Sequence, residues 1–352
     1  MEFGVFYQLP CADDQSPADR YADTIAQAQL ADELGFDAVW LAELHFNPRF
    51  SIMSAPLLVA AAIAQTTRRI KVGTAVNLVP LHHPIRLAEE TATLDVISGG
   101  RCIFGIGRGS NPRQFEGYGV DVAGGRQRFT EAVDFILKAW TNEEFSYRGE
   151  HYQAENLRIM PKPQQKPHPP VYIASNSPDT FELVGSMGHN ILVAPLVVSM
   201  QGAVDGLAVY RETLLEHGHD PAEAKINVNV PVYVTEDRNK ARAALEPSFE
   251  NYLGLVRASR SSATRRLHNL TYGQICDELG AIGDPDQCVA KLRAFQETYQ
   301  PQEFMCWFNP GGLLPHQEVE KSMRLFAQEV MPQFQEAAAS PIVDQVSASA
   351  EG

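Results

Sequence analysis

Cysteine is scarce in this sequence, and its placement excludes the folds and sites that depend on it. The five cysteines lie far apart, and no two of them form a C-x-x-C pair. Disulfide frameworks and zinc sites need paired spacings, whereas isolated cysteines in odd number are typical of reduced thiols. The first residues also lack the basic and then apolar order of a signal peptide. We therefore expect a cytoplasmic protein without a metal site.

Long apolar runs and basic clusters are lacking as well. The longest apolar run, residues 52–64, contains Pro56 and is shorter than the about 20 residues that span a membrane. The chain has 29 basic and 43 acidic side chains, a net charge of −14, whereas nucleic acid requires a clustered basic surface. The most basic segment, residues 257–266, is short and Ser-rich, and we interpret it as a solvated loop. We expect neither a nucleic-acid partner nor a membrane.

Strand-like and helix-like segments alternate along the chain. Apolar segments predict eight strands, at residues 3–7, 38–41, 70–76, 101–106, 171–174, 190–193, 227–234 and 304–308. The segments between them have apolar residues at helical spacing, most clearly from Phe129 to Trp140. This order predicts an α/β fold, a (β/α)8 TIM barrel that forms a single domain over residues 1–335. An open doubly wound sheet is the alternative.

Two segments interrupt this alternation. Residues 141–170 are rich in proline and are predicted to be an insertion, because the strand and helix pattern resumes directly after them. Residues 336–352 are rich in alanine and serine, and we expect a disordered tail.

The end of the second predicted strand carries a carboxylate and an imidazole. TIM-barrel chemistry lies where strands end, and Glu43 and His45, two residues apart, face the same side of an extended backbone. Such a pair can hold or move a proton near neutral pH, and a structural hydrogen bond is the alternative. His82 and His83 are adjacent and point to opposite sides of an extended chain, so we predict structural roles for both.

Several segments combine glycine or a helix start with arginine. Residues 105–110 do not complete G-x-G-x-x-G, because Ser110 stands at the third glycine position, but they surround Arg108 with a flexible turn. Arg126 follows two glycines, and Ser175, Asn176 and Ser177 precede a helix that begins at Pro178. Guanidinium groups and free N–H groups at a helix start bind phosphate. Surface ion pairs and simple helix capping are the alternatives.

Other features narrow the reaction class. Small residues at 73–75 permit a flat group to approach the backbone, although a neighbouring layer of barrel side chains is the commoner occupant. Barrel enzymes often bind phosphate after strands seven and eight, and Gly311 and Gly312 follow strand eight, but the loop that holds these glycines supplies no arginine. The sequence has no G-x-S-x-G elbow, P-loop or H-E-x-x-H motif. These observations favour a phosphorylated cofactor that carries the chemistry.

Six segments together resemble the bacterial luciferase-like family of flavin-dependent oxidoreductases. They are residues 35–37, 40–46, 72–75, 83–90, 94–101 and 104–109, in this order and spacing. The resemblance implies a two-component monooxygenase that receives reduced FMN from a separate flavin reductase. With O2 it would form a C4a-(hydro)peroxyflavin and oxygenate a small carbonyl or aromatic substrate.

The resemblance also assigns residues. Arg108, Arg126, Ser175, Asn176 and Ser177 would contact the FMN phosphate, and Glu43, Ala75 and Val76 would lie beside the isoalloxazine ring. Glu43 and His45 would be catalytic, and a non-proline cis peptide is implied at Ala75–Val76. Residues 257–283 match the family's mobile lid, and a homodimer through barrel helices is implied, for which the apolar helix at 54–64 is suited.

Two departures bear on activity. Light-emitting relatives have a histidine where this chain has Leu44, and a cysteine where it has Gly107. The resemblance therefore implies oxygenation without light emission. A deazaflavin-dependent hydride-transfer enzyme and a non-catalytic partner barrel are the alternative functions.

Overall fold

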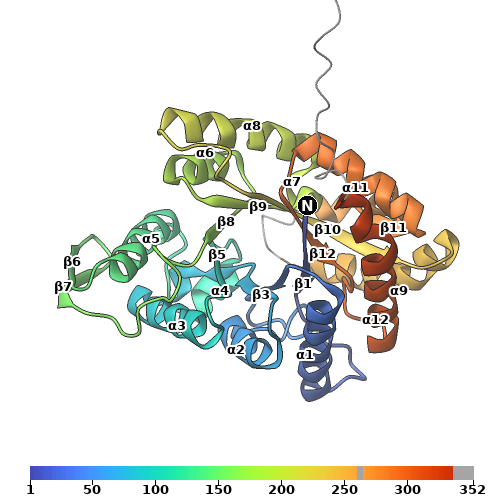
Figure 1. The fold of residues 1–352 in the computed structure, drawn as a ribbon, viewed down its shortest axis with the longest axis horizontal. Coiled ribbons are helices and arrows are strands. Elements are labelled where there is room, and N and C mark those ends of the chain that lie inside the picture. Colours follow the sequence, from blue (N-terminus) through green and yellow to red (C-terminus); the bar gives the residue numbers. More distant parts are fainter. Residues whose placement is uncertain (260–264, 336–352) are drawn as a thin grey trace, which may run out of the picture.

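Eight parallel strands close into a barrel in the computed structural model, which describes residues 1–259 and 265–335 (Figure 1). In barrel order the strands are β1 (Glu2–Tyr7), β2 (Ala38–Leu41), β3 (Lys71–Thr74), β5 (Cys102–Gly107), β8 (Val171–Ser175), β9 (Asn190–Val193), β10 (Ile226–Val234) and β12 (Glu303–Trp307). The barrel closes because β12 pairs with β1, with Glu303 beside Glu2. The predicted (β/α)8 barrel is confirmed, and the open-sheet alternative is wrong.

Two short strands were not predicted. β4 (Asn77–Leu78) pairs with β5, and β11 (Ala281–Gly283) pairs with the last residues of β10. Strands of two and three residues are too short to show an alternating pattern, so the sequence offers no periodic signal for them.

Helices surround the barrel on the outside (Figure 1). They are α1 (Pro17–Leu34), α2 (Pro56–Thr66), α3 (Pro84–Ile97), α4 (Pro112–Gly117), α5 (Gly125–Thr141), α6 (Pro178–Met187), α7 (Pro195–Val198), α8 (Met200–Glu216), α9 (Arg238–Arg257), α10 (Tyr272–Gln274), α11 (Pro285–Tyr299) and α12 (His316–Leu325). Short turns of other helix types are η1 (Val79–Leu81), η2 (Arg265–Asn269), η3 (Ile275–Leu279), η4 (Phe326–Val330) and η5 (Met331–Phe334). Many begin with proline, whose missing N–H has no partner at a helix start in any case.

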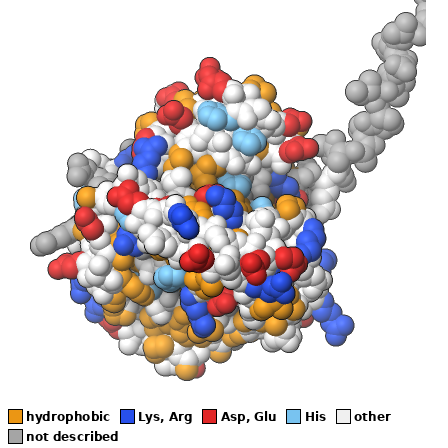
Figure 2. Space-filling model, turned by 90° about the vertical axis from the view of Figure 1, so that its left-hand side faces the viewer, with side chains coloured by type: hydrophobic (Ala, Val, Ile, Leu, Met, Phe, Trp, Pro, Cys, Tyr) orange, Lys and Arg blue, Asp and Glu red, His pale blue; other side chains and the backbone are white. Residues whose placement is uncertain are grey.

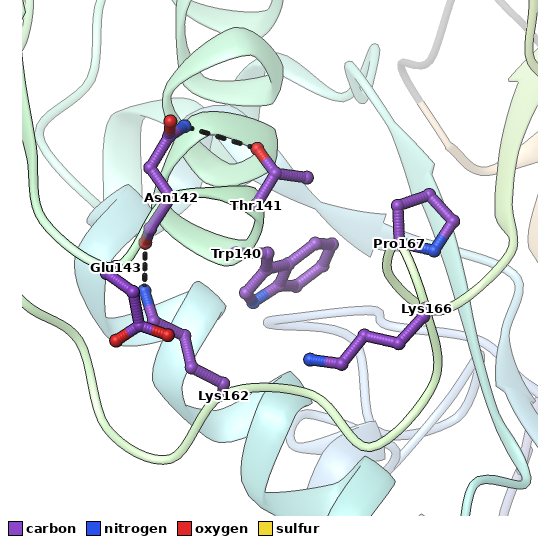
Figure 3. A pocket seen from close by; sticks show the side chains of 7 residues that line it. All are labelled: Trp140, Thr141, Asn142, Glu143, Lys162, Lys166 and Pro167. Carbon is purple, nitrogen blue, oxygen red and sulfur yellow. Dashed lines mark hydrogen bonds between the residues drawn. The ribbon is translucent and has the colours of Figure 1, made fainter.

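The insertion at residues 141–170 contains an antiparallel hairpin, β6 (Phe145–Arg148) and β7 (Gln153–Leu157). The carboxylate of Glu131 on α5 holds the hairpin turn by accepting the N–H groups of Glu150, His151 and Tyr152. A small hollow of about 180 Å³ lies between this segment and the end of α5 (Figure 3). There, Lys162 donates to the carbonyl of Ala139 at 2.7 Å and to that of Asn142. Because the lysine satisfies carbonyls at a helix end, this hollow is part of the attachment of the insertion.

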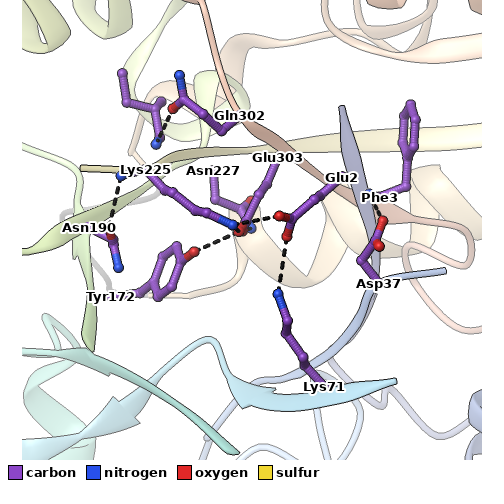
Figure 4. Close-up of polar contacts among 11 residues, drawn as sticks. Glu2, Phe3, Asp37, Lys71, Tyr172, Asn190, Lys225, Asn227, Gln302 and Glu303 are labelled. Atoms are coloured by element: carbon purple, nitrogen blue, oxygen red, sulfur yellow. Dashed lines mark hydrogen bonds and ion pairs between the residues drawn. The ribbon is translucent and has the colours of Figure 1, made fainter. Parts of the chain in front are cut away.

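The barrel interior is filled below its mouth. The indole of Trp40 lies between Gly4 and Gly73, where an added Cβ would approach it to 2.6 and 2.9 Å, and it meets Tyr172 edge-on at 5.2 Å. Lower down, Lys225 pairs with Glu2 at 2.6 Å and with Glu303 at 3.1 Å (Figure 4). These layers close the end of the barrel formed by the strand starts.

Charged side chains of both signs are interspersed on the face shown in Figure 2. Within the described residues, no helix combines the length and the apolar character needed to cross a membrane. The predicted tail at 336–352 lies outside the described residues, as do residues 260–264 of the predicted lid. The later part of that predicted lid forms η2, α10, η3 and β11, and Leu267, Ile275 and Leu279 in it are buried.

Candidate active site

A cavity of about 530 Å³ opens at the carboxyl ends of the barrel strands. We distinguish two sides of its wall. The polar half comprises Glu43, His45, Ala75, Val76, Arg108, Asn176, Ser177 and Thr180, and the aromatic half comprises Phe6, Gln8, Phe50, Tyr252 and Trp307. The position and the size, within the range of about 300–1,000 Å³ for small-molecule sites, are those of a barrel enzyme's ligand pocket.

The carboxylate of Glu43 is the centre of a buried hydrogen-bond cluster. Its Oε1 lies 2.7 Å from Nε2 of His45 and 2.7 Å from Nε2 of His82, and its Oε2 accepts the N–H of Leu78 at 2.8 Å. The Glu43 side chain is 0% exposed, and that of His82 is 29% exposed. An ionised carboxylate accepts hydrogen bonds and does not donate them, so both imidazoles present an N–H to it.

This cluster shifts the proton affinities of its members. Burial raises the pKa of Glu43, but the hydrogen bonds from His45, His82 and Leu78 outweigh it, so that the pKa lies below its usual value. Burial lowers the pKa of His82, yet the hydrogen bond and the charge of Glu43 give a net rise. The cluster therefore favours an ionised carboxylate beside a protonated His82.

The second nitrogen of His45 faces an exposed tyrosine. Nδ1 of His45 lies 3.3 Å from the hydroxyl of Tyr118, and the two rings are 4.9 Å apart. Phe46 contacts the same rings, its backbone has φ +63°, and an added Cβ at Gly117 would lie 2.3 Å from its ring. Since Tyr118 is 43% exposed, a hydrogen-bonded chain extends from the cavity wall at Glu43 to solvent.

Small residues let the floor of the polar half lie close to β5. The Ala75–Val76 peptide is cis, which confirms the geometry that the resemblance implied. An added Cβ at Gly105 would lie 1.7 Å from the carbonyl oxygen of Thr74, and one at Gly107 would lie 2.6 Å from a methyl group of Val76. Glycine is therefore required at 105, and a cysteine at 107 would displace Val76 from its present position.

Arg126 forms an ion pair with Asp179 beside the start of α6, and the charge of Arg108 also acts on this carboxylate. Nη1 of Arg126 lies 3.3 Å from Oδ2 of Asp179, and the hydroxyl of Ser177 donates to Oδ1 of Asp179 at 2.6 Å. The Ser177 hydrogen bond and the charges of Arg108 and Arg126 lower the pKa of Asp179. Within residues 1–259 and 265–335, Arg108 has neither a hydrogen bond nor an ion pair of its own. The rim thus holds a guanidinium group that is available to an anion.

The side chains of the turn before α6 lie partly in the cavity wall and partly in the core. Asn176, Ser177 and Thr180 line the cavity, whereas Ser175 is buried and its hydroxyl lies 2.7 Å from that of Thr180. Arg126 reaches Asp179 without lining the cavity wall. The structure therefore brings Arg108, Asn176 and Ser177 to the cavity wall, whereas Ser175 is buried in the core and Arg126 lies outside the cavity lining with a half-exposed side chain.

The loop after β12, with Gly311 and Gly312, is the other position where a barrel enzyme could bind phosphate, and here it is packed against protein. An added Cβ at Gly311 would lie 1.7 Å from the carbonyl oxygen of Ser248, and one at Gly312 would lie 2.6 Å from Pro10. Both glycines are buried in this packing, so the loop after β12 serves a structural purpose.

Sequence reasoning missed three features of this site. The structural role predicted for His82 is incomplete, because its ring binds the buried Glu43 carboxylate. The three-residue helical turn η1 directly precedes His82. Thr180 was missed although it stands three residues after the N-cap Ser177, the position from which a side chain caps the helix start. The aromatic half was missed because its members come from distant segments.

The aromatic half is a set of rings from β1, β12, α9 and the loop after β2. Trp307 meets Tyr252 edge-on at 4.8 Å and Phe6 edge-on at 5.6 Å, and Phe50 stacks on Tyr252 at 5.7 Å. Perpendicular ring pairs at these distances are favourable arrangements of aromatic quadrupoles. The rings form a stiff apolar wall beside the polar half.

Two curated relatives match nearly the whole chain, and a third matches about half of it. The alkanal monooxygenase alpha chain of the Kryptophanaron alfredi symbiont is 27% identical over 360 residues, covering 96% of this chain and 99% of its own. The oxygenase component of the flavin-dependent trigonelline monooxygenase from Acinetobacter baylyi is 28% identical over 352 residues, 96% of each chain. The uncharacterized protein y4wF of Sinorhizobium fredii is 39% identical over 191 residues, 54% of this chain and 55% of that protein.

Solved structures share the fold. Monooxygenase RslO1 from Streptomyces bottropensis superposes with a TM-score of 0.86 at 27% identity, covering 95% of this chain and 100% of that one. The oxygenating constituent of 3,6-diketocamphane monooxygenase from Pseudomonas putida, in complex with FMN, has a TM-score of 0.81 at 22% identity. The match covers 95% of this chain and 98% of that one. The coenzyme F420 dependent tetrahydromethanopterin reductase from Methanopyrus kandleri has a TM-score of 0.74 at 22% identity. The match covers 95% of this chain and 99% of that one.

A family model agrees with both comparisons. The model described as luciferase-like monooxygenase matches residues 1–300, which include every barrel strand except β12. The chain belongs to the luciferase-like monooxygenase family.

Proposed function

We propose that the protein is the oxygenase of a two-component system, which takes reduced FMN from a separate reductase and uses O2 to oxygenate a small organic substrate. The observation that carries this proposal is the arrangement of the polar half, where Arg108, which has no hydrogen bond or ion pair among the described residues, and the start of α6 line the same cavity as Ala75 and Val76. The trigonelline relative is named as an oxygenase component, which supports a reductase partner.

The residues present fit FMN at this place. Arg108, Ser177 and Thr180 would hold the phosphate, because they combine a guanidinium group with the hydroxyl and N–H groups of a helix start. Ala75 and Val76 would support the ring, with Glu43 beside it. Reduced flavin, when bound, supplies the electrons with which O2 is activated.

The chain's own groups would control protons and water. Glu43 fixes the orientation of His45 through the 2.7 Å contact, and His45 in turn exposes Nδ1 toward Tyr118. His45 is the catalytic residue that we propose to hold or transfer a proton at the cavity wall, with Glu43 as its orienting base. The rings of the aromatic half would exclude water from the reacting atoms.

The test is a comparison of flavin reoxidation with and without the protein. Anaerobic reduced FMN is mixed with the protein and then with O2, and flavin absorbance is followed over time. We expect bound flavin to reoxidise more slowly than free flavin. Reoxidation at the rate of free flavin would remove the basis of the proposal, and absence of binding by any flavin would favour a non-catalytic partner barrel.

A deazaflavin-dependent hydride transfer is the second candidate, because an F420-dependent reductase shares the fold. The two candidates differ in O2 consumption. Titration with FMN and with F420, followed by measurement of O2 uptake, separates them, since hydride transfer to a deazaflavin consumes no O2.

Two further expectations belong to this proposal. We propose that two copies pair through α2, where Leu58 is 75% exposed, and sedimentation at several concentrations tests this. We also propose that residues 257–283 act as a lid over bound flavin. Limited proteolysis should then cut within this segment first, and FMN should slow the cut; equal cleavage with and without FMN would contradict a lid.

A further inference from the structure

The flavin contacts proposed above leave the aromatic half of the cavity unused. Its rings come from β1, β12, α9 and the loop after β2, whereas those flavin contacts come from the loops after β2, β3, β5 and β8. We infer that this half is the binding site for the organic substrate, and that the substrate is an uncharged, planar aromatic molecule with a carbonyl or hydroxyl group. The inference rests on the proposed function for its reaction.

Two unpartnered polar groups indicate that this wall binds a ligand. Gln8 is 8% exposed, lines the cavity, and its Oε1 has no hydrogen-bond partner. Tyr252 is 5% exposed and also lines the cavity, and its hydroxyl has no partner among the residues that the structure describes. Both side chains line the cavity and make no hydrogen bond to the described residues, so a ligand in this half can use their hydrogen-bonding capacity.

Ring geometry favours a flat ligand over a flexible chain. Tyr252 and Trp307 meet at 88° and Phe6 and Trp307 at 78°, so each pair forms a corner. A planar aromatic ring in such a corner stacks on one wall and presents its edge to the other, and both contacts are favourable. An alkyl chain gains burial there but neither of these directional contacts, and it loses more conformational freedom.

Charge favours an uncharged ligand. Among the lining residues that the structure describes, Glu43 and Arg108 have the charged side chains other than histidine. The Glu43 carboxylate already accepts three hydrogen bonds, and Arg108 belongs to the phosphate site. A charged substrate against the aromatic half would therefore be desolvated without a counter-ion, which is strongly unfavourable.

Binding of three probes to the cofactor-free protein, measured by calorimetry, tests the inference. The probes are 4-hydroxyacetophenone, decanal and 4-hydroxybenzoate, which represent a neutral aromatic, an aliphatic aldehyde and an aromatic anion. We expect 4-hydroxyacetophenone to bind most tightly and 4-hydroxybenzoate to bind at least about tenfold more weakly. Decanal binding equal to or tighter than that of 4-hydroxyacetophenone, or failure of the aromatic probes to bind, would overturn the inference.

Variants then locate the site. Tyr252→Phe retains the ring and removes the hydroxyl, so we expect affinity for 4-hydroxyacetophenone to fall by about three- to tenfold, the value of one hydrogen bond. Gln8→Leu should give a loss of similar size. Arg108→Ala is the matched control. It should leave the affinity for this probe unchanged and weaken the binding of FMN. Equal affinities in wild type and Tyr252→Phe would contradict the assignment, and circular dichroism checks the fold of each variant.

Competition separates this inference from the proposed function. Saturating FMN should leave a binding site for 4-hydroxyacetophenone, because the two ligands would use different halves of the cavity. Displacement of the probe by FMN would show that the flavin itself occupies the aromatic half and would overturn the inference alone. Probe binding without binding of any flavin would overturn the proposed function alone.

Discussion

In the polar half of the cavity, most hydrogen-bonding side chains are matched to one another, whereas in the aromatic half the side chains of Gln8 and Tyr252 have no hydrogen-bond partner among the described residues. Glu43 accepts from His45, His82 and Leu78, while Oε1 of Gln8 has no partner. A network that is complete before binding holds its groups in fixed positions. The difference suggests that the polar half is organised in advance, and that the aromatic half gains its hydrogen bonds when a ligand arrives.

The largest effect should come from removing the central ring of the aromatic half. Trp307→Ala should lower the free energy of unfolding by about 3 kcal/mol, because Trp307 is 4% exposed and packs against Phe6 and Tyr252. Urea unfolding measures this change. Arg108→Ala should stay within about 0.5 kcal/mol of wild type in the same measurement. Equal losses in both variants would show that the two halves contribute alike to folding.

The second effect concerns Arg108, a side chain of the polar half that has no hydrogen bond or ion pair among the described residues. Arg108→Ala should weaken FMN binding by about 1.5–3 kcal/mol, because a hydrogen bond to a charged group is lost. Fluorescence titration measures the affinity for FMN. Riboflavin, which lacks the phosphate, should bind the wild type and the variant with equal affinity. Arg113→Ala, at an exposed position on α4, is the matched control. If riboflavin affinity fell as far as FMN affinity, Arg108 would not be a phosphate ligand.

The third effect is a pH dependence of the Glu43 cluster. The pKa of His82 is raised from 6.5 and that of Glu43 is lowered from 4.5, so their pairing stabilises the fold between these two values. It is lost as pH rises through the raised pKa of His82 and as pH falls through the lowered pKa of Glu43. His82→Gln should therefore destabilise the protein more at pH 6 than at pH 9.

A double-mutant cycle sharpens this third prediction. In a Glu43→Gln background, His82→Gln should have the same effect on the free energy of unfolding at both pH values, because the carboxylate partner is gone. Urea unfolding at each pH provides the data. A pH-dependent difference that persists without the carboxylate would assign the effect of His82 to another group.

The smallest effect has the opposite sign. Asp179→Asn should tighten FMN binding by at most about fivefold, because the carboxylate beside Arg126 competes with phosphate, and exposed ion pairs contribute about 0.2–1 kcal/mol. Asp134→Asn, which breaks a similarly exposed pair with Lys138, serves as the control. Weaker FMN binding in Asp179→Asn would mean that Asp179 positions Ser177 rather than competing with the ligand.

Much of the fold was predictable, because each barrel strand is a short, nearly continuous apolar segment between helices of clear periodicity. The site was predictable where one segment carries it, as with Glu43 and His45, which share a face at the end of β2. The sequence predicted that Arg108 and Arg126 lie near the helix start at Ser177, but it did not predict that their charges act on Asp179.

The rest depends on contacts between segments that are far apart in sequence. Tyr252 comes from α9 and Trp307 from β12, and nothing in either segment indicates that their rings meet. His82 was predicted from its extended neighbourhood, but the turn η1 directly before it sets the direction of its ring. The short β11 carries no periodic signal, and its pairing with β10 arises from the barrel itself.

The indole of Trp40, held between Gly4 and Gly73, fills the barrel interior below the cavity. A bulkier ligand cannot be accommodated by deepening the pocket, since an enlarged floor would remove the packing that seals the strands. Variation in what the enzyme accepts must therefore arise in the connecting segments around the entrance, whose lengths and side chains change without disturbing the barrel. Descendants of this chain could diversify their chemistry while keeping an unaltered interior.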